Sequence, residues 1–204
     1  MVATLVAITA LLLAGCSSDS GSDDKIRGAK EADSSNSSRS PSSNANRPKV
    51  EVPKGLKMDF EGWTDEDPRI QTVLNDGREG VRAVNEAILQ TPSDPNSPNV
   101  SFYHSSDALK ETKDWISGFK ENDLTITGTI RYFDPVVKVR KGGRAAELIY
   151  CSDESGGSSK SRKTGKIDDS GTGSNFVQYV TLLQKDSEGV WKAAALEGNR
   201  GACS

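Results

Sequence analysis

The sequence predicts an α+β domain in which two or three helices are followed by an antiparallel meander of four to five strands. Three observations lead to this prediction. Apolar residues recur at helical spacing over residues 70–119, they alternate with polar residues from residue 124 onward, and turn signals separate the alternating segments. The 204 residues suffice for one domain of ordinary size, with further segments in front of it.

The first helix is predicted to begin at Pro68, because Asp65 and Asp67 precede it, and an acidic N-cap followed by proline at the first helical position is typical of a helix start. Apolar residues then follow a helical period over residues 70–89. Two glycines in the middle of this segment predict a weak point, because glycine disfavours the helix by up to about 1 kcal/mol. A turn with three prolines over residues 91–98 separates this helix from the next.

The second helix is predicted from Ser105 or Ser106 through Phe119, and after it the period changes to two. The pair Asp134-Pro135 is expected to break or bend the first strand, and Gly142-Gly143 is expected to form a hairpin turn. The predicted strands cover residues 124–132, 136–139, 144–151, 176–185 and 190–197.

Hydrophobic residues are distributed unevenly, and this divides the chain into three parts. Residues 1–16 contain 13 of them, whereas the Ser-rich residues 17–57 contain only 7 in 41 positions. We therefore predict a signal peptide at 1–15, a disordered tether at 16–57 and a folded domain at 58–204. The charges of the tether are nearly balanced, so a flexible chain is favoured over a basic segment for lipid headgroups.

Residues Leu13-Ala14-Gly15-Cys16 match the lipobox of bacterial lipoproteins. The small residues before Cys16 give a peptidase access to the bond, and the Cys16 thiol is the site where the diacylglyceryl group is attached. Two or more acyl chains anchor a protein stably to a membrane. The alternative is a buried N-terminal helix with an incidental cysteine, but a core helix would not continue directly into a Ser-rich tether. The protein is therefore expected on the outer face of the bacterial cytoplasmic membrane.

Composition excludes several classes of function. The net charge of −3 gives no basic excess for nucleic-acid binding, and the sequence lacks the repeated apolar runs of a polytopic membrane protein. Three cysteines and one histidine are too few for most zinc-cluster or multi-histidine sites, so we expect no metal and no cofactor. Residues 152–175 contain one large apolar residue, Ile167, and are predicted to form a long flexible loop.

The two remaining cysteines, Cys151 and Cys203, predict a disulfide in an oxidising compartment. Cys151 ends one predicted strand and Cys203 follows the last one, so adjacent antiparallel strands would bring them together. Two free buried thiols are the alternative.

The chain resembles actinobacterial secreted lipoproteins of the nuclear transport factor 2-like fold. The resemblance covers residues 65–203 and is carried by the lipobox, the helix-then-sheet order and four short motifs. These are Tyr150-Cys151-Ser152-Asp153-Glu154-Ser155, Thr164-Gly165-Lys166, Val190-Trp191-Lys192 and Gly201-Ala202-Cys203. It implies helices packed on a curved antiparallel sheet that surrounds an internal cavity. The fold hosts enzymes and binding modules alike, so it implies neither function.

Few residues are candidates for chemistry. His104, the single histidine, is interpreted as structural. Asp134 is a candidate cavity carboxylate, since it follows Tyr132 and Phe133, and an apolar setting raises the pKa of such a group. Tyr132, Tyr150 and Tyr179 are candidates for lining a ligand cavity, or else core residues.

The leading hypothesis is therefore a lipid-anchored extracytoplasmic lipoprotein that binds a small ligand or a cell-envelope protein without catalysis. The alternative is a small hydrolase or isomerase that uses a cavity carboxylate.

Overall fold

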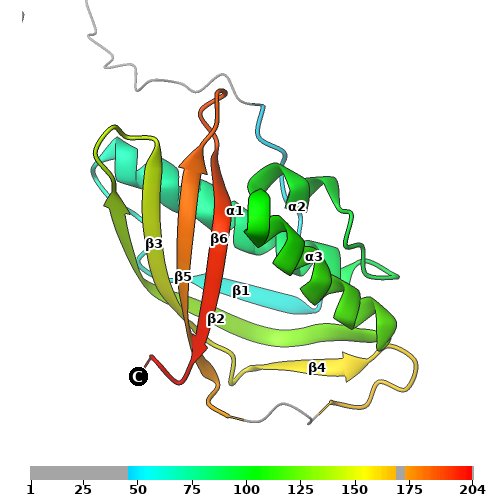
Figure 1. The fold of residues 1–204 in the computed structure, drawn as a ribbon. Helices are drawn as coiled ribbons and strands as arrows, with labels where there is room; N and C mark the ends of the chain where they lie inside the picture. The colour runs from blue at the N-terminus through cyan, green and yellow to red at the C-terminus, as the bar shows by residue number, and fades with distance from the viewer. Residues whose placement is uncertain (1–45, 169–172, 204) are drawn as a thin grey trace, which may run out of the picture. The chain divides into compact units, whose positions relative to one another are not determined.

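The computed structural model describes residues 46–168 and 173–203. The predicted signal peptide, Cys16 and the tether as far as residue 45 lie outside the described residues. The described chain forms three helices, α1 (Pro68–Leu89), α2 (Pro98–Tyr103) and α3 (Ser106–Glu121), which pack against one curved, open sheet (Figure 1). Its six strands are β1 (Leu56–Phe60), β2 (Leu124–Val139), β3 (Ala145–Asp153), β4 (Gly157–Ser161), β5 (Phe176–Lys185) and β6 (Trp191–Arg200). The predicted α+β class is confirmed.

The sheet has the order β1-β2-β3-β5-β6, and β4 also pairs with β2. Only β1 runs parallel to its neighbour. The long strand β2 pairs with β4 along its first part and with β3 along its second part. The predicted interruption at Asp134-Pro135 is a bulge within this continuous strand, where Asp134 has a φ of 50°. The two predicted strands on either side of it are therefore one element.

Helix α1 begins as predicted, because the Asp67 side chain accepts a hydrogen bond from the backbone N–H of Arg69 at 2.9 Å. The helix then continues without interruption through the predicted weak point. Gly77 faces the sheet there: a Cβ atom at this position would lie 2.5 Å from Cδ2 of Leu148 on β3, so the Leu148 side chain would have to shift. The glycine thus lets α1 approach the sheet closely.

Alternating residues of β3 define the two faces of the sheet. Ala146, Leu148, Tyr150 and Ser152 are at most 5 % exposed, and the first three belong to a core cluster that includes Val73 and Leu74 of α1. These side chains define the inner face, which the helices cover. A second cluster joins α1, α2 and α3 through residues such as Ala87, Val100 and Ile116.

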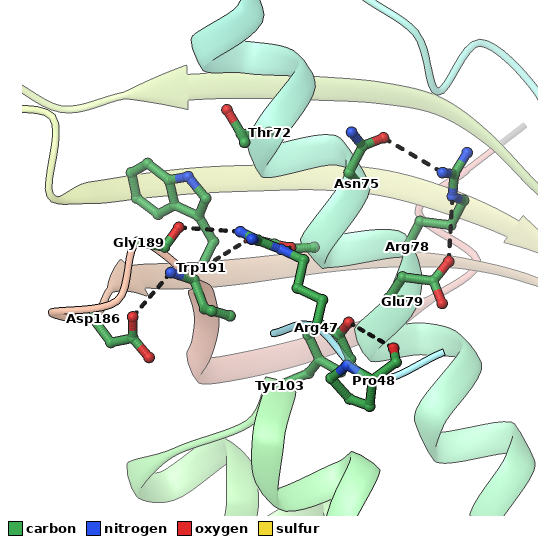
Figure 2. A network of polar contacts seen from close by, with 12 residues as sticks. Arg47, Pro48, Thr72, Asn75, Arg78, Glu79, Tyr103, Asp186, Gly189 and Trp191 are labelled. Carbon is green, nitrogen blue, oxygen red and sulfur yellow. Dashed lines mark hydrogen bonds and ion pairs between the residues drawn. The ribbon is translucent and has the colours of Figure 1, made fainter. Parts of the chain in front are cut away.

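The folded domain begins earlier than the predicted residue 58. Val50 is 2 % exposed, and β1 begins at Leu56. Figure 2 shows Arg47 beside Gly189, and the Arg47 guanidinium donates to the carbonyl of Gly189. The same guanidinium also donates to the carboxylate of Asp76 on α1. We call residues 46–50 the N-terminal strap. Its attachment depends on tertiary contacts rather than on a local hydrophobic pattern.

The prediction of one long loop over residues 152–175 is wrong in part, because this range contains regular strand structure. Its first residues complete β3, and residues 157–161 form β4, which pairs with the start of β2. Residues 166–168 return along β4, where the N–H of Ser161 donates to the carbonyl of Lys166 at 2.9 Å. Strand β4 consists of small and polar residues, so its sequence carries no apolar alternation, and backbone pairing with β2 stabilises it instead.

The predicted disulfide between Cys151 and Cys203 is confirmed, with a Cα–Cα distance of 6.1 Å. It joins β3 to the segment that follows β6.

Candidate functional site

The three tyrosines that the sequence singled out lie together on the inner face of the sheet. Tyr150 and Tyr179 are register partners on β3 and β5, and their rings stack with centroids 5.1 Å apart. The Tyr132 ring on β2 lies 6.3 Å from that of Tyr150. We call Tyr132, Tyr150 and Tyr179 the tyrosine row.

Other aromatic rings fill the space over Tyr132 and Tyr150, the two buried members of this row. Phe60 of β1 stacks on Tyr132 at 4.9 Å, and Trp63 packs edge-on against Tyr150 at 5.1 Å. The Trp63 indole N–H donates to the backbone carbonyl of Tyr132 at 3.2 Å, which fixes the orientation of the ring. Tyr132 and Tyr150 are each 5 % exposed as a result. The place where the resemblance implied a cavity is therefore occupied by side chains.

Polar groups lie at both ends of the row. At the deep end, the side-chain amide of Asn85 on α1 donates to the Tyr132 hydroxyl at 3.4 Å. At the outer end, the Tyr179 hydroxyl donates to Glu154 at 3.4 Å, and Arg200 of β6 donates to the other oxygen of the same carboxylate at 3.0 Å. We call Glu154, Tyr179 and Arg200 the rim; Arg200 is exposed, and the other two are half-buried.

Burial raises the pKa of all three tyrosines well above the ordinary value of a phenol. The neighbouring carboxylate of Glu154 adds to this effect by disfavouring a second negative charge. The row therefore consists of neutral phenols at physiological pH. Such groups donate hydrogen bonds, but they do not act as general bases.

The structure does not place Asp134 in an apolar setting. Its side chain is exposed at the bulge of β2 and is not enclosed by apolar residues. The predicted role as a cavity acid is therefore not supported by the position of this residue.

His104 is a buried structural residue at the end of α2. It is 5 % exposed, and its Nδ1 atom lies 3.1 Å from the carbonyl oxygen of Val100, to which it donates. Burial lowers the pKa of the imidazole to about 4, because the charged form would lose its hydration. His104 is therefore neutral at pH 7, as the structural interpretation requires.

We expect His104 to make the domain less stable in acid. The unfolded chain takes up a proton near pH 6.5, whereas the folded chain takes it up only near pH 4. Stability is therefore fully present above pH 6.5 and is lost as the pH falls towards 4, by up to about 3 kcal/mol. Urea unfolding at pH 7 and pH 4.5 measures this loss. The variant His104→Gln should lack this component of the pH dependence, and parallel pH dependences in the two proteins would contradict the assignment.

The described residues show no other obvious site. They contain no group of three or more metal-ligating His, Cys, Asp or Glu side chains, and none of their helices is long and apolar enough to cross a membrane. One open surface hollow has a volume of about 590 Å³ and is lined by residues such as Asn122, Leu124 and Ile167, and another of about 210 Å³ is lined by residues such as Arg131 and Asp153. The tyrosine row lines neither hollow.

Sequence reasoning missed most of the groups that surround the tyrosines. Glu154 lay in the predicted loop, and Arg200 lay beyond the predicted end of the last strand. Trp63 and Phe60 precede the first helix and belong to no periodic pattern. Arg200 could have been found only by extending the predicted last strand a few residues beyond 197, which pairs Arg200 with Val177 and so places it near Tyr179.

The sequence matches no family model and no curated protein. Several solved structures, among them the following two, are similar in fold. A ketosteroid isomerase-like protein from Erwinia carotovora atroseptica is 14% identical, with 67% of this chain and 99% of that chain covered and a TM-score of 0.46. The intermembrane space region of the chloroplast protein ARC6 is 12% identical, with 68% and 100% covered and a TM-score of 0.43. At these values the similarity is one of fold alone.

Proposed function

We propose that this chain is a lipid-anchored, extracytoplasmic module of the nuclear transport factor 2-like type, which binds a protein of the cell envelope without catalysing a reaction. The observation that supports a protein partner is that side chains fill the space over the tyrosine row. Small-molecule sites are concave and have volumes of about 300–1,000 Å³. Here Phe60 and Trp63 pack directly on the tyrosine row and occupy that space.

The groups that stay accessible suit a protein partner. The rim presents a phenol, a carboxylate and a guanidinium side by side, and tyrosine and arginine are enriched at protein interfaces. A partner that approaches the rim would find both hydrogen-bond donors and an acceptor at the surface. This favours an envelope protein over a small ligand.

The alternative hypothesis of a hydrolase or isomerase needs a carboxylate whose pKa is raised by apolar surroundings. Asp134 is exposed, and the tyrosines of the row are held as neutral phenols by burial. The geometry therefore favours binding over catalysis.

The anchor is proposed from the lipobox at residues 13–16 and the Ser-rich segment that follows it. The disulfide between Cys151 and Cys203 supports an extracytoplasmic location, because such bonds persist in oxidising compartments.

One experiment in growing cells tests the anchor and the partner together. Cells that express the full chain, with a photo-crosslinking residue at Ser155 beside the rim, are fed an alkyne analogue of palmitate. We expect the chain to carry the acyl label and, after irradiation, to form an adduct with a different envelope protein. In the variant Cys16→Ala the acyl label should be lost.

Two controls make the outcome specific. The variant Cys151→Ser/Cys203→Ser should retain the label, since these residues are not acylated in the proposal. Label that persists in Cys16→Ala would refute the anchor. Labelled chain that gives no protein adduct at Ser155 would refute the rim as a protein-binding surface.

A further inference from the structure

The edge of β6 that faces away from β5 is occupied only along its first half. The N–H of Trp191 on this edge donates to Asp76 of α1 at 2.9 Å, and the carbonyl of Ala193 accepts from the N–H of Ser105 at 2.8 Å. Figure 1 shows that α3, which begins beside this point, leaves β6 and runs towards β2 and β4. The second half of β6, residues 196–200, continues beyond these contacts. We call residues 196–200 the free edge.

The hydrogen bonds to β5 show which backbone groups lie on the free edge. In an antiparallel pair, the N–H and C=O groups of successive residues point alternately towards the neighbouring strand and away from it. The N–H of Gly201 donates to the carbonyl of Phe176, so Asn199 and Glu197 also bond to β5. The backbone groups that point away from β5 belong to Leu196, Gly198 and Arg200. Within residues 46–168 and 173–203, no group supplies a hydrogen-bond partner for them.

The free edge leaves room for a second strand. Gly198 and Arg200 are exposed. Gly198 faces the tyrosine row, because a Cβ atom at this position would lie 3.4 Å from Cε1 of Tyr179. Glycine within a strand allows another backbone to approach closely. Proteins often protect such an edge with lysine or proline, and residues 196–200 contain neither.

Glu197 sets the charge that favours a partner. It points to the sheet face opposite Gly198, is exposed, and makes no ion pair with the described residues. Glu147, two strands away on β3, has the same sign and pairs with Lys138. The residues around Glu197 on this face are uncharged: Gln178, Val180, Leu182, Ala195 and Asn199. Opposite charges on adjacent strands stabilise their pairing, so an added strand is favoured by a lysine or arginine beside Glu197.

We infer that the envelope protein binds as an extended segment that adds a strand to the free edge, with a lysine or arginine opposite Glu197. This inference rests on the proposed function for the existence of the partner and specifies how the partner is held. The unpaired backbone groups of Leu196 and Gly198 bind the backbone of the segment, and its side chains give specificity. The segment runs beside the rim, because Arg200 belongs both to the free edge and to the rim.

A second copy of the chain fits the free edge poorly. Two β6 strands related by a two-fold axis run antiparallel. Pairing centred on Glu197 would set two carboxylates directly opposite each other, and pairing centred on Gly198 would set Leu196 opposite the charged Arg200. A segment of a different protein avoids both conflicts, since it can place a basic residue opposite Glu197 and an apolar one opposite Leu196.

The test uses the full chain in growing cells, with the photo-crosslinking residue at Ser155, and compares two variants of Gly198. Gly198→Pro removes an N–H of the free edge but no bond to β5, whereas Gly198→Ala adds the same Cβ atom and keeps the N–H. We expect Gly198→Pro to lower the yield of the protein adduct about tenfold and Gly198→Ala to leave it within about twofold. Glu197→Lys should lower the yield about threefold. Glu188→Lys, in the exposed β5–β6 turn, is its matched control and should change nothing.

Hydrogen exchange of the purified full chain checks the free edge without a substitution. The amide of Gly198 should exchange much faster than those of Glu197 and Asn199, which bond to β5. If thermal melting shows that Gly198→Pro disturbs folding, this measurement and Glu197→Lys replace it. A Gly198 amide that is protected as strongly as its neighbours would show that the edge is already covered, and would overturn the inference.

The outcomes in cells separate strand addition from the proposed function. An adduct at Ser155 that Gly198→Pro and Glu197→Lys both leave unchanged overturns strand addition but keeps the rim as a binding surface. No adduct at Ser155, together with an adduct from the probe at the exposed Ala195 that Gly198→Pro abolishes, overturns the rim and supports strand addition. No adduct at either position, or only an adduct of twice the mass of the chain, overturns the inference.

Discussion

Replacing Arg47 with methionine is expected to lower the free energy of unfolding by about 3–5 kcal/mol, because the change leaves a buried carboxylate without its counter-ion. Asp76 is 1 % exposed and accepts from Nε of Arg47 at 2.6 Å and from Nη2 at 2.8 Å. The same carboxylate also accepts from the backbone N–H of Trp191 at 2.9 Å. The hydrogen bond to Asp76 raises the pKa of the Arg47 guanidinium, so Arg47 stays charged. Urea unfolding at pH 7 measures the loss.

A matched control lies two residues further along the N-terminal strap. Lys49 pairs with Glu51, but the two side chains are 86 % and 73 % exposed, so Lys49→Met should change the stability by less than about 0.5 kcal/mol. The double variant Arg47→Met/Asp76→Asn should recover part of the loss, because the amide oxygen still accepts from Trp191 and no buried charge is left unpaired. If Arg47→Met is as mild as Lys49→Met, the strap does not depend on this ion pair.

Elements with local signals were predicted well. The start of α1 follows from the short-range geometry of Asp67 and Pro68, and the bounds of β5 agree with the predicted 176–185 because turn residues flank this apolar run on both sides. The break in β2 was predicted from Asp134-Pro135, although the strand absorbs it as a bulge. Signals of this kind lie within a few residues and need no knowledge of the partner element.

Elements held by distant partners were missed. The N-terminal strap depends on an ion pair between residues 29 positions apart, and β4 depends on backbone bonds to β2. Neither leaves a hydrophobic period in the sequence. The tyrosines were predicted to line a cavity or to be core residues, and the answer depended on Trp63, whose place above Tyr150 is set by tertiary packing. Sequence periodicity assigns residues to a face, but it does not say whether the space in front of that face is filled.

Removing the disulfide is the second change with a large expected effect. The variant Cys151→Ala/Cys203→Ala should be less stable than the wild type by up to about 4 kcal/mol, because the bond closes a loop with a sequence separation of 52 and restricts the unfolded chain. This is a large part of the 5–15 kcal/mol that stabilises a typical domain. Urea unfolding of both proteins in the absence of reductant measures the difference.

The native contacts near the bond indicate that the folded state should survive its loss. Gly201 still donates to the carbonyl of Phe176 at 2.7 Å, and Arg200 still pairs with Glu154, so the end of β6 has other attachments. Reductant should therefore destabilise the wild type and Cys16→Ala equally, while leaving the double alanine variant unaffected. A double alanine variant that unfolds at the same urea concentration as the wild type would show that the bond adds no stability. Sensitivity to reductant in that variant would point to a thiol other than Cys151 and Cys203.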